Sequence, residues 1–269
     1  MMDIIFKLLM GTENSKEDLT NFLLSVLNLS ADEYEDITIS NPFLPPEYKG
    51  DKLGILDVKL KLKSGKVLNI EVQVDPMPHM DNRILFYVSK LITEQMGESD
   101  RYEKIKPVIS IIITGHPLIK NSEKYHHHFR LYDIESGVLL TDTLAIHTLE
   151  VPKARDISEC NDKAELLNWM KFFDIKTEEE LKMLAEKSPA MKKVTMRLLE
   201  LSADEKARQL YEARLKEQRD SWARESGARQ DERFVIAKKF LSMGMSVVDI
   251  STGTGLSVNE VEDLQNADF

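Results

Sequence analysis

Two runs of alternating apolar and polar residues, 55–62 and 67–74, constrain the fold more than any other feature of the chain. Both alternate with a period of two and are rich in aliphatic residues, which predicts two β-strands. Asp57 lies on the first run, whereas Glu71 and Gln73 lie on the second and share one face of it. Two carboxylates and an amide that meet on a rigid sheet suit metal-dependent cleavage of a phosphodiester.

The turn between these runs decides whether Asp57 joins the other two side chains. A two-residue Ser-Gly loop would place Asp57 opposite Val72, on the wrong face. A three-residue loop over 63–65, with Gly65 in the left-handed region, would place Asp57 opposite Glu71. We predict the second register, because glycine is the residue that this bulged turn requires. A half-solvated sheet face with ordinary polar residues is the alternative interpretation.

The spacing resembles a known family. Asp57, a 13-residue spacer and Glu71-Val72-Gln73 resemble the core motif of the PD-(D/E)XK nuclease superfamily, in the form typical of the recombination-promoting nuclease (Rpn) family of transposase-like proteins. Further segments with similar order and spacing are Asp3 to Lys7, Arg83 with Tyr87, Gly97 with Tyr102, and the segments 107–111, 128–131 and 147–153. The resemblance covers residues 1–155, with a looser match beyond.

The resemblance implies an α/β fold, with a restriction-endonuclease-like mixed central sheet flanked by helices and an all-α C-terminal region. It implies a DNA endonuclease that serves mobile-element recombination or phage defence. Asp57, Glu71 and the backbone carbonyl of Val72 would bind Mg²⁺, with Mn²⁺ as an alternative. Gln73 stands where many members of the superfamily carry lysine, and would orient the attacking water.

Asp3, Arg83 and Tyr87 are accessory candidates for the same site. Asp3 would be an additional acid, and a favourable charge at a helix N-terminus is its alternative role. Arg83, Tyr87 and Lys90 recur at helical spacing and would contact the DNA backbone, or would simply form a solvated helix face. RNA remains open as a substrate, and a non-catalytic, DNA-associated scaffold built on a nuclease fold is the alternative function.

The remaining pattern predicts the other elements. Helices are expected over 2–10, 15–28 and 79–96, the last with Ile84, Leu85, Val88, Leu91 and Ile92 facing inward. Strands are expected over 36–39, 108–114, 126–132 and 143–151. We predict a nuclease-like domain over 1–155, a helical region with an extended charged helix over 156–233, and a small helix-turn-helix-like tail over 234–269.

The last predicted helix of the tail carries Glu260, Glu262 and Asp263 but no lysine or arginine, which disfavours reading of DNA. We expect docking, or homo-oligomerisation through these helices, instead. The net charge of −10 confines DNA to a local groove.

The single cysteine, Cys160, rules out an intrachain disulfide and indicates a cytoplasmic protein. We expect no signal peptide and no membrane span. Three consecutive histidines, 126–128, alternate faces on a strand and therefore cannot converge on one metal ion. His147 is expected to be a hydrogen-bonded core residue.

Overall fold

The computed structural model describes a chain with two compact units, residues 1–207 and 208–269. The residues described are Phe6, Leu9 and Met10, and the ranges 16–27, 37–40, 43–44, 54–55, 58–157, 163–203 and 233–267. Asp3, Asp57, Cys160 and most of the predicted charged helix lie outside them. The domain boundaries expected after residues 155 and 233 stay predictions.

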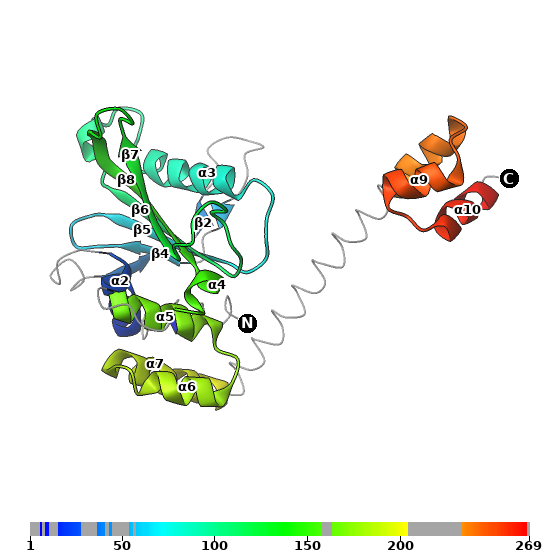
Figure 1. Cartoon of the computed structure of the whole chain (residues 1–269). Helices are drawn as coiled ribbons and strands as arrows, with labels where there is room; N and C mark the ends of the chain where they lie inside the picture. The colour runs from blue at the N-terminus through cyan, green and yellow to red at the C-terminus, as the bar shows by residue number, and fades with distance from the viewer. Residues whose placement is uncertain are drawn as a thin grey trace. The chain divides into compact units, whose positions relative to one another are not determined.

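A mixed six-stranded sheet forms the centre of the first unit (Figure 1). Its order is β1 (Thr38–Ser40), β4 (Val58–Lys61), β5 (Val67–Gln73), β6 (Val108–Thr114), β8 (Leu139–Glu150) and β7 (His126–Tyr132). The pairs β5–β6 and β6–β8 are parallel, and the other pairs are antiparallel. A separate two-stranded sheet joins β2 (Phe43–Leu44) to β3 (Gly54–Ile55). This architecture confirms the predicted α/β class.

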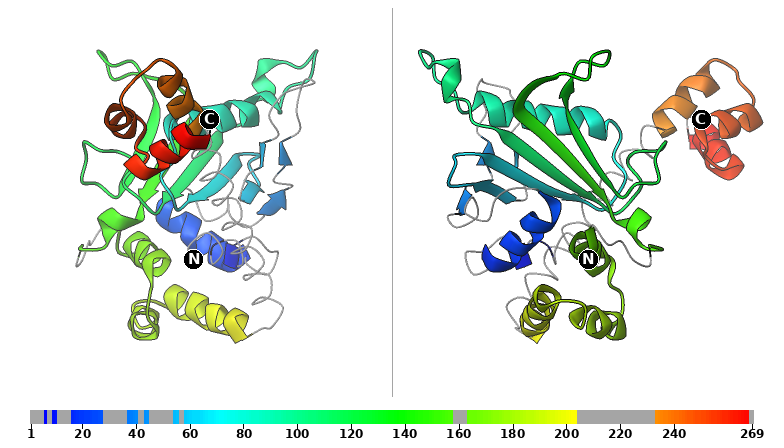
Figure 2. Two further views of the ribbon diagram at one scale, coloured as in Figure 1. Left: turned by 90° about the vertical axis from the view of Figure 1, so that its right-hand side faces the viewer. Right: turned by 60° about the vertical axis from the view of Figure 1, so that its left-hand side comes forward.

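Helices cover both faces of the large sheet. Helix α3 (Met80–Thr93) lies along one face, whereas α2 (Lys16–Val26) and α5 (Ala164–Asp174) lie along the other (Figure 2). The predicted strand 108–114 matches β6, whose seven residues are all buried. Coverage on both faces explains why β6 is continuously apolar rather than alternating.

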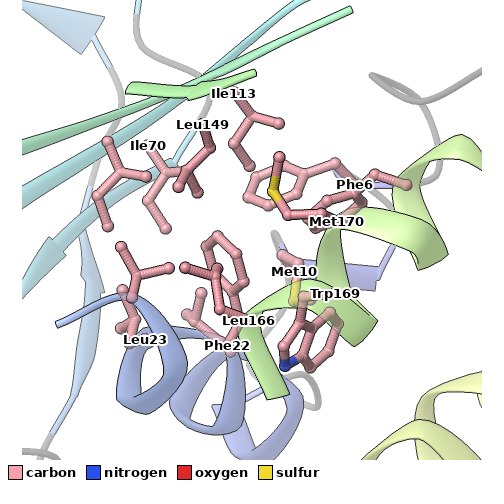
Figure 3. Close-up of a cluster of buried hydrophobic side chains, with 14 of the residues drawn as sticks. Phe6, Met10, Phe22, Leu23, Ile70, Ile113, Leu149, Leu166, Trp169 and Met170 are labelled. Atoms are coloured by element: carbon pink, nitrogen blue, oxygen red, sulfur yellow. The ribbon is translucent and has the colours of Figure 1, made fainter. Parts of the chain in front are cut away.

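The larger core lies between the sheet and α2 with α5. Alternate residues of β5, Leu68, Ile70 and Val72, point into it. Phe22 meets Trp169 and Phe173 edge to face, with ring centroids 5.6 and 5.7 Å apart. Figure 3 shows Ile70 of the sheet beside Phe22 and Trp169 of the helices in this cluster. Helix α5 therefore completes the core of the sheet, although it follows the segment that the resemblance covers most closely.

Three short helices finish the first unit. Helix α4 (Val151–Ala154) follows β8 directly, and α6 (Glu178–Ala185) begins at a capping box formed by Thr177 and Glu180. Helix α7 (Pro189–Ala203) is joined to α2 by a hydrogen bond of 2.6 Å from Arg197 to the buried carboxylate of Asp18. No helix among the described residues is long and apolar enough to cross a membrane.

The second unit packs a helix over residues 233–242 with α9 (Val247–Thr254) and α10 (Val258–Ala267) around Ala237, Ile250, Leu256 and Val261. Ser257 and Glu260 form a capping box through reciprocal bonds. Helix α9 continues through Thr254. The hydroxyl of Thr254 bonds the carbonyl of Ile250, and Gly255 ends the helix at a φ of 70°.

Helix α3 faces the sheet largely as predicted, because Ile84, Val88 and Leu91 are buried and Ile92 packs against the same cluster. Its buried residues are Met80, Ile84, Tyr87, Val88 and Leu91. The inward placement of Leu85 was wrong, because its side chain is 52% exposed. Tyr87, expected on an outward stripe with Arg83 and Lys90, is buried. Tyr87, rather than Leu85, therefore completes the face of α3 that covers the sheet.

The hairpin between β4 and β5 has the predicted register. Val58 pairs with Ile70 and Lys61 with Val67, as the three-residue loop requires. Gly65 adopts a φ of 85°, and its amide donates to the carbonyl of Leu62 over 2.8 Å. One more bond, from the Leu62 amide to the Lys66 carbonyl, closes the bulged turn at 2.9 Å. The turn chemistry of one glycine therefore sets which face each side chain of β5 occupies.

Gly65→Ala is expected to lower the free energy of unfolding by about 1–2 kcal/mol, because a Cβ is disfavoured in the left-handed region. The added atom would also lie 3.3 Å from Cγ of Lys106. Urea unfolding followed by circular dichroism measures the loss. Gly65→Asn is the matched control and should lose less, since asparagine tolerates this conformation. Equal stability of the alanine variant and the wild type would contradict the turn assignment.

Candidate active site

Polar side chains form a set on the face of the sheet that α3 covers. Asn69, Glu71 and Gln73 alternate along β5 with the residues of the larger core, so all three face α3. The side chain of Glu71 is 6% exposed, and Asn69 is fully buried. The sequence prediction that Glu71 and Gln73 share a face is therefore confirmed.

Neighbouring strands extend this polar set. Glu71 pairs with Ile112 of β6, which in turn pairs with Thr148 of β8. Asn69 donates a hydrogen bond of 3.3 Å to the hydroxyl of buried Ser110. Ser110 and Thr148 were not among the predicted site residues. Ser110 is the one polar residue among the first six of β6, which is a usable signal, whereas Thr148 lies in a strand with several other polar residues and carries no such signal.

Gln73 lies at the carboxyl end of β5. Its amide nitrogen donates to the backbone carbonyl of Asp75 over 2.8 Å. This bond orients the amide, so that its carbonyl oxygen is available to a water molecule. Gln73 pairs with Thr114, and Thr114 pairs with Glu150, so three polar residues end the parallel strands.

Helix α3 brings a cation to the same face. The guanidinium of half-buried Arg83 lies 4.8 Å from the ring centroid of Tyr87, which holds it by a cation–π contact. The Nε of Arg83 is buried and has no hydrogen-bond acceptor within the described residues. Lys90 lies 5.3 Å from the ring of Phe86. Arg83, Tyr87 and Lys90 therefore do not form one solvated stripe, because Tyr87 faces the sheet.

A loop between β6 and β7 closes against the end of β5. At Gly115 a Cβ would lie 2.9 Å from the carbonyl oxygen of Val74, so the two backbones touch directly. The Nδ1 of His116 lies 3.2 Å from the same oxygen. This loop thus borders Gln73 and limits the space beside it.

Oxygen ligands dominate the residues available to a metal. Glu71 offers a buried carboxylate and Val72 a backbone carbonyl one residue away, and hard cations such as Mg²⁺ prefer such groups. Among the described residues, no group of three or more His, Cys, Asp or Glu side chains has the arrangement of a metal site. Asp57 and Asp3, the other predicted acids, lie outside those residues.

The histidines of β7 separate as strand alternation predicts. His126 and His128 both stack on His147, at centroid distances of 5.2 and 4.1 Å. His127 lies on the opposite face, 3.3 Å from a carboxylate oxygen of Glu150. His147 is buried and hydrogen-bonded to His126 over 2.9 Å, which confirms its predicted core role.

Burial and positive neighbours suppress the charge of this histidine cluster. Burial, followed by Lys163, lowers the pKa of His126 to about 4. Burial and the two neighbouring histidines lower the pKa of His147 to about 3. The pKa of His128 is lowered too, by burial and by Arg130. Lys163 donates to Nδ1 of His126 over 2.9 Å, so His126 donates from Nε2 to His147.

The fold and the polar set define a class of protein: a restriction-endonuclease-like α/β fold with Glu-x-Gln on its central strand. Comparison with family models bears this out. The model of the PD-(D/E)XK nuclease family transposase matches residues 1–226, and the chain belongs to that family. A search of curated proteins found no match, and a search of solved structures found none either.

The histidine cluster predicts a pH-dependent stability. The folded pKa values lie below the ordinary value of 6.5, so unfolding takes up protons between about pH 6.5 and pH 4. The free energy of unfolding is therefore full above pH 6.5 and falls as the pH drops through this window. Urea titrations from pH 7 to pH 4 should show a shallower fall for His147→Gln than for the wild type.

His79→Asn is the matched control for this experiment. His79 is an exposed residue at the N-cap of α3 and has a φ of 56°, which asparagine tolerates. Its pH profile should follow that of the wild type. Identical profiles for His147→Gln and the wild type would show that the cluster does not govern acid stability.

Proposed function

We propose that this protein is a metal-dependent DNA endonuclease that hydrolyses phosphodiester bonds in the recombination of mobile elements or in phage defence. The observation that carries the proposal is the register of β4 and β5. The pair of Val58 with Ile70 is the one that the predicted register requires, and this supports the prediction that Asp57, which lies outside the described residues, faces Glu71. Membership of the nuclease family supports the same assignment.

In this proposal Asp57, Glu71 and the carbonyl of Val72 hold Mg²⁺, or Mn²⁺ in its place. The bound ion supplies Lewis-acid polarisation of the phosphate and neutralises charge that develops in the transition state. Gln73 accepts a hydrogen bond from the attacking water at its carbonyl oxygen, because its nitrogen is already bound to the Asp75 carbonyl. The amide orients that water but does not take its proton.

Positive charge in the proposed site comes from α3 rather than from β5. Gln73 replaces a lysine found in many superfamily members and brings no charge to the transition state. Arg83, held over the Tyr87 ring, is placed to bind a DNA phosphate on the same face. Tyr87 is then a positioning residue beneath the guanidinium. Asp3 is assigned as an accessory acid on the family resemblance alone.

The second unit is assigned to assembly, not to reading of DNA. Helix α10 presents Glu260, Glu262 and Asp263, which repel phosphate. Val235, Met243 and Val248 are each more than 60% exposed, which supports homo-oligomerisation through these helices. We place the protein in the cytoplasm, on the single cysteine of its sequence.

Cleavage of supercoiled plasmid DNA with Mg²⁺ or Mn²⁺ tests the endonuclease. Wild type is expected to nick the plasmid, and Asp57→Ala and Glu71→Ala should each lower the rate by about a hundredfold or more, because each removes a metal ligand. Chelation by EDTA should stop the reaction. Gln73→Lys should retain cleavage, since lysine adds charge without removing a ligand.

Asp142→Ala is the matched control, because Asp142 is an exposed acid on β8. It should cleave as fast as the wild type. A wild type that binds DNA but cleaves neither DNA nor RNA with either metal would overturn the proposal and leave the scaffold function. Cleavage of RNA alone would retain the site and change the substrate.

A further inference from the structure

A second cluster of reactive side chains lies apart from Glu71 and Gln73. It joins Ser122 of the β6–β7 loop, His127 of β7 and Glu150 at the end of β8. The hydroxyl of Ser122 lies 2.7 Å from Nε2 of His127. The Nδ1 of the same ring lies 3.3 Å from Oε1 of Glu150. Nucleophile, base and orienting acid in this order are the arrangement of a serine hydrolase triad.

The two carboxylate oxygens of Glu150 face different groups. Oε2 binds the loop, and Oε1 faces the ring of His127. The side chain of Glu150 is fully buried. Oε2 accepts the amides of Leu118 and Ile119, at 2.8 and 3.2 Å, and pairs with the ammonium of Lys153 at 2.6 Å. Oε1 faces Nδ1 of His127 across 3.3 Å, and neither of these two buried atoms makes a hydrogen bond within the described residues. The separation of 3.3 Å is longer than in a closed triad, as in many ligand-free sites.

These contacts set the tautomer of His127. A carboxylate opposite Nδ1 favours a proton on that nitrogen, which leaves Nε2 as an acceptor. Nε2 then accepts the hydroxyl proton of Ser122 over 2.7 Å. The ring is also stacked on Phe129, with centroids 5.9 Å apart, which fixes its orientation. His127 is therefore placed as a general base for Ser122.

Anchoring of the loop does not require this histidine or this hydroxyl. Lys153 donates to the backbone carbonyls of Ile119 and Ser122, each at 2.6 Å. The amides of Leu118 and Ile119 also donate to the Glu150 carboxylate. The side chains of Lys153 and Glu150 thus hold the loop by its main-chain atoms. The loop is therefore fixed without the Ser122–His127 bond, and this bond is not needed for its structure.

We propose that Ser122 is an activated nucleophile that hydrolyses small carboxylic esters, an activity separate from the nuclease site. Ser122 Oγ attacks the ester carbonyl carbon while its proton passes to Nε2 of His127. The carbon–oxygen bond to the alcohol breaks, and the alcohol leaves with that proton. Water then attacks the acyl-serine by the same route, releasing the carboxylic acid and restoring the hydroxyl.

Access and charge stabilisation favour small substrates. Ser122 is half exposed, so an acyl group reaches its hydroxyl directly from solvent. The backbone amides of Ser122 and Glu123 donate no hydrogen bond within the described part of the chain. An amide of the nucleophile or of the residue that follows it is a common oxyanion donor.

Labelling with a fluorophosphonate, followed by peptide mass mapping, tests the nucleophile in the wild-type chain. The adduct is expected on Ser122 and not on Ser136, an exposed serine that bonds a carboxylate but no histidine. Hydrolysis of p-nitrophenyl acetate should fall by about a hundredfold in Ser122→Ala and His127→Gln.

Ser136→Ala is the matched control and should react as the wild type does. Circular dichroism establishes that each variant is folded before its rate is compared. Absence of an adduct on Ser122 in the wild type would overturn the proposal without reference to any variant. Labelling of Ser122 at an unchanged rate in folded His127→Gln would overturn it as well, because the histidine would then play no part.

Discussion

The pairing of β5 with its two neighbours is the constraint on which the rest of the structure depends. β5 lies between the hairpin partner β4 and the parallel strand β6, so its register is held on both sides. Leu68, Ile70 and Val72 enter the larger core only in this register. Each such side chain gains about 1.5–3 kcal/mol on burial, so a one-residue slip would forfeit several kcal/mol. Core packing thereby holds Glu71 on the opposite face.

That opposite face combines apolar cover with buried polar groups. Tyr87 and Ile84 of α3 pack with Val67 and Ile112 in a smaller cluster. Polar atoms beside such a cluster are costly, about 1–3 kcal/mol each, unless hydrogen bonds satisfy them. The hydrogen bond from Asn69 to Ser110 lowers this cost for these two buried side chains. Both faces of the sheet therefore carry an apolar cluster, and the α3 face also holds the polar residues of the proposed site.

Much of this could be predicted where a signal lies within one strand or turn. Gly65 in the loop and the alternation of β5 were sufficient to predict the register and the shared face of Glu71 and Gln73. The placement of Tyr87 and Leu85 was not predictable, because both fit an amphipathic helix and only the sheet beneath decides its rotation. The pairing of His128 with His147 arises from strand order, which periodicity within one strand does not contain. The Ser122–His127–Glu150 cluster was not predicted either, because it too depends on which strands are neighbours.

Gln73, which stands where many members of the superfamily carry lysine, leaves the proposed site with one positive charge fewer. A lysine beside Glu71 would neutralise part of its charge before any metal binds. With a neutral amide there, the carboxylates keep their full attraction for a divalent cation, while the transition state loses a fixed positive charge. Arg83 compensates from α3, where the Tyr87 ring rather than an acid holds it. In a chain with a net charge of −10, a guanidinium not committed to a described carboxylate is well suited to a phosphate.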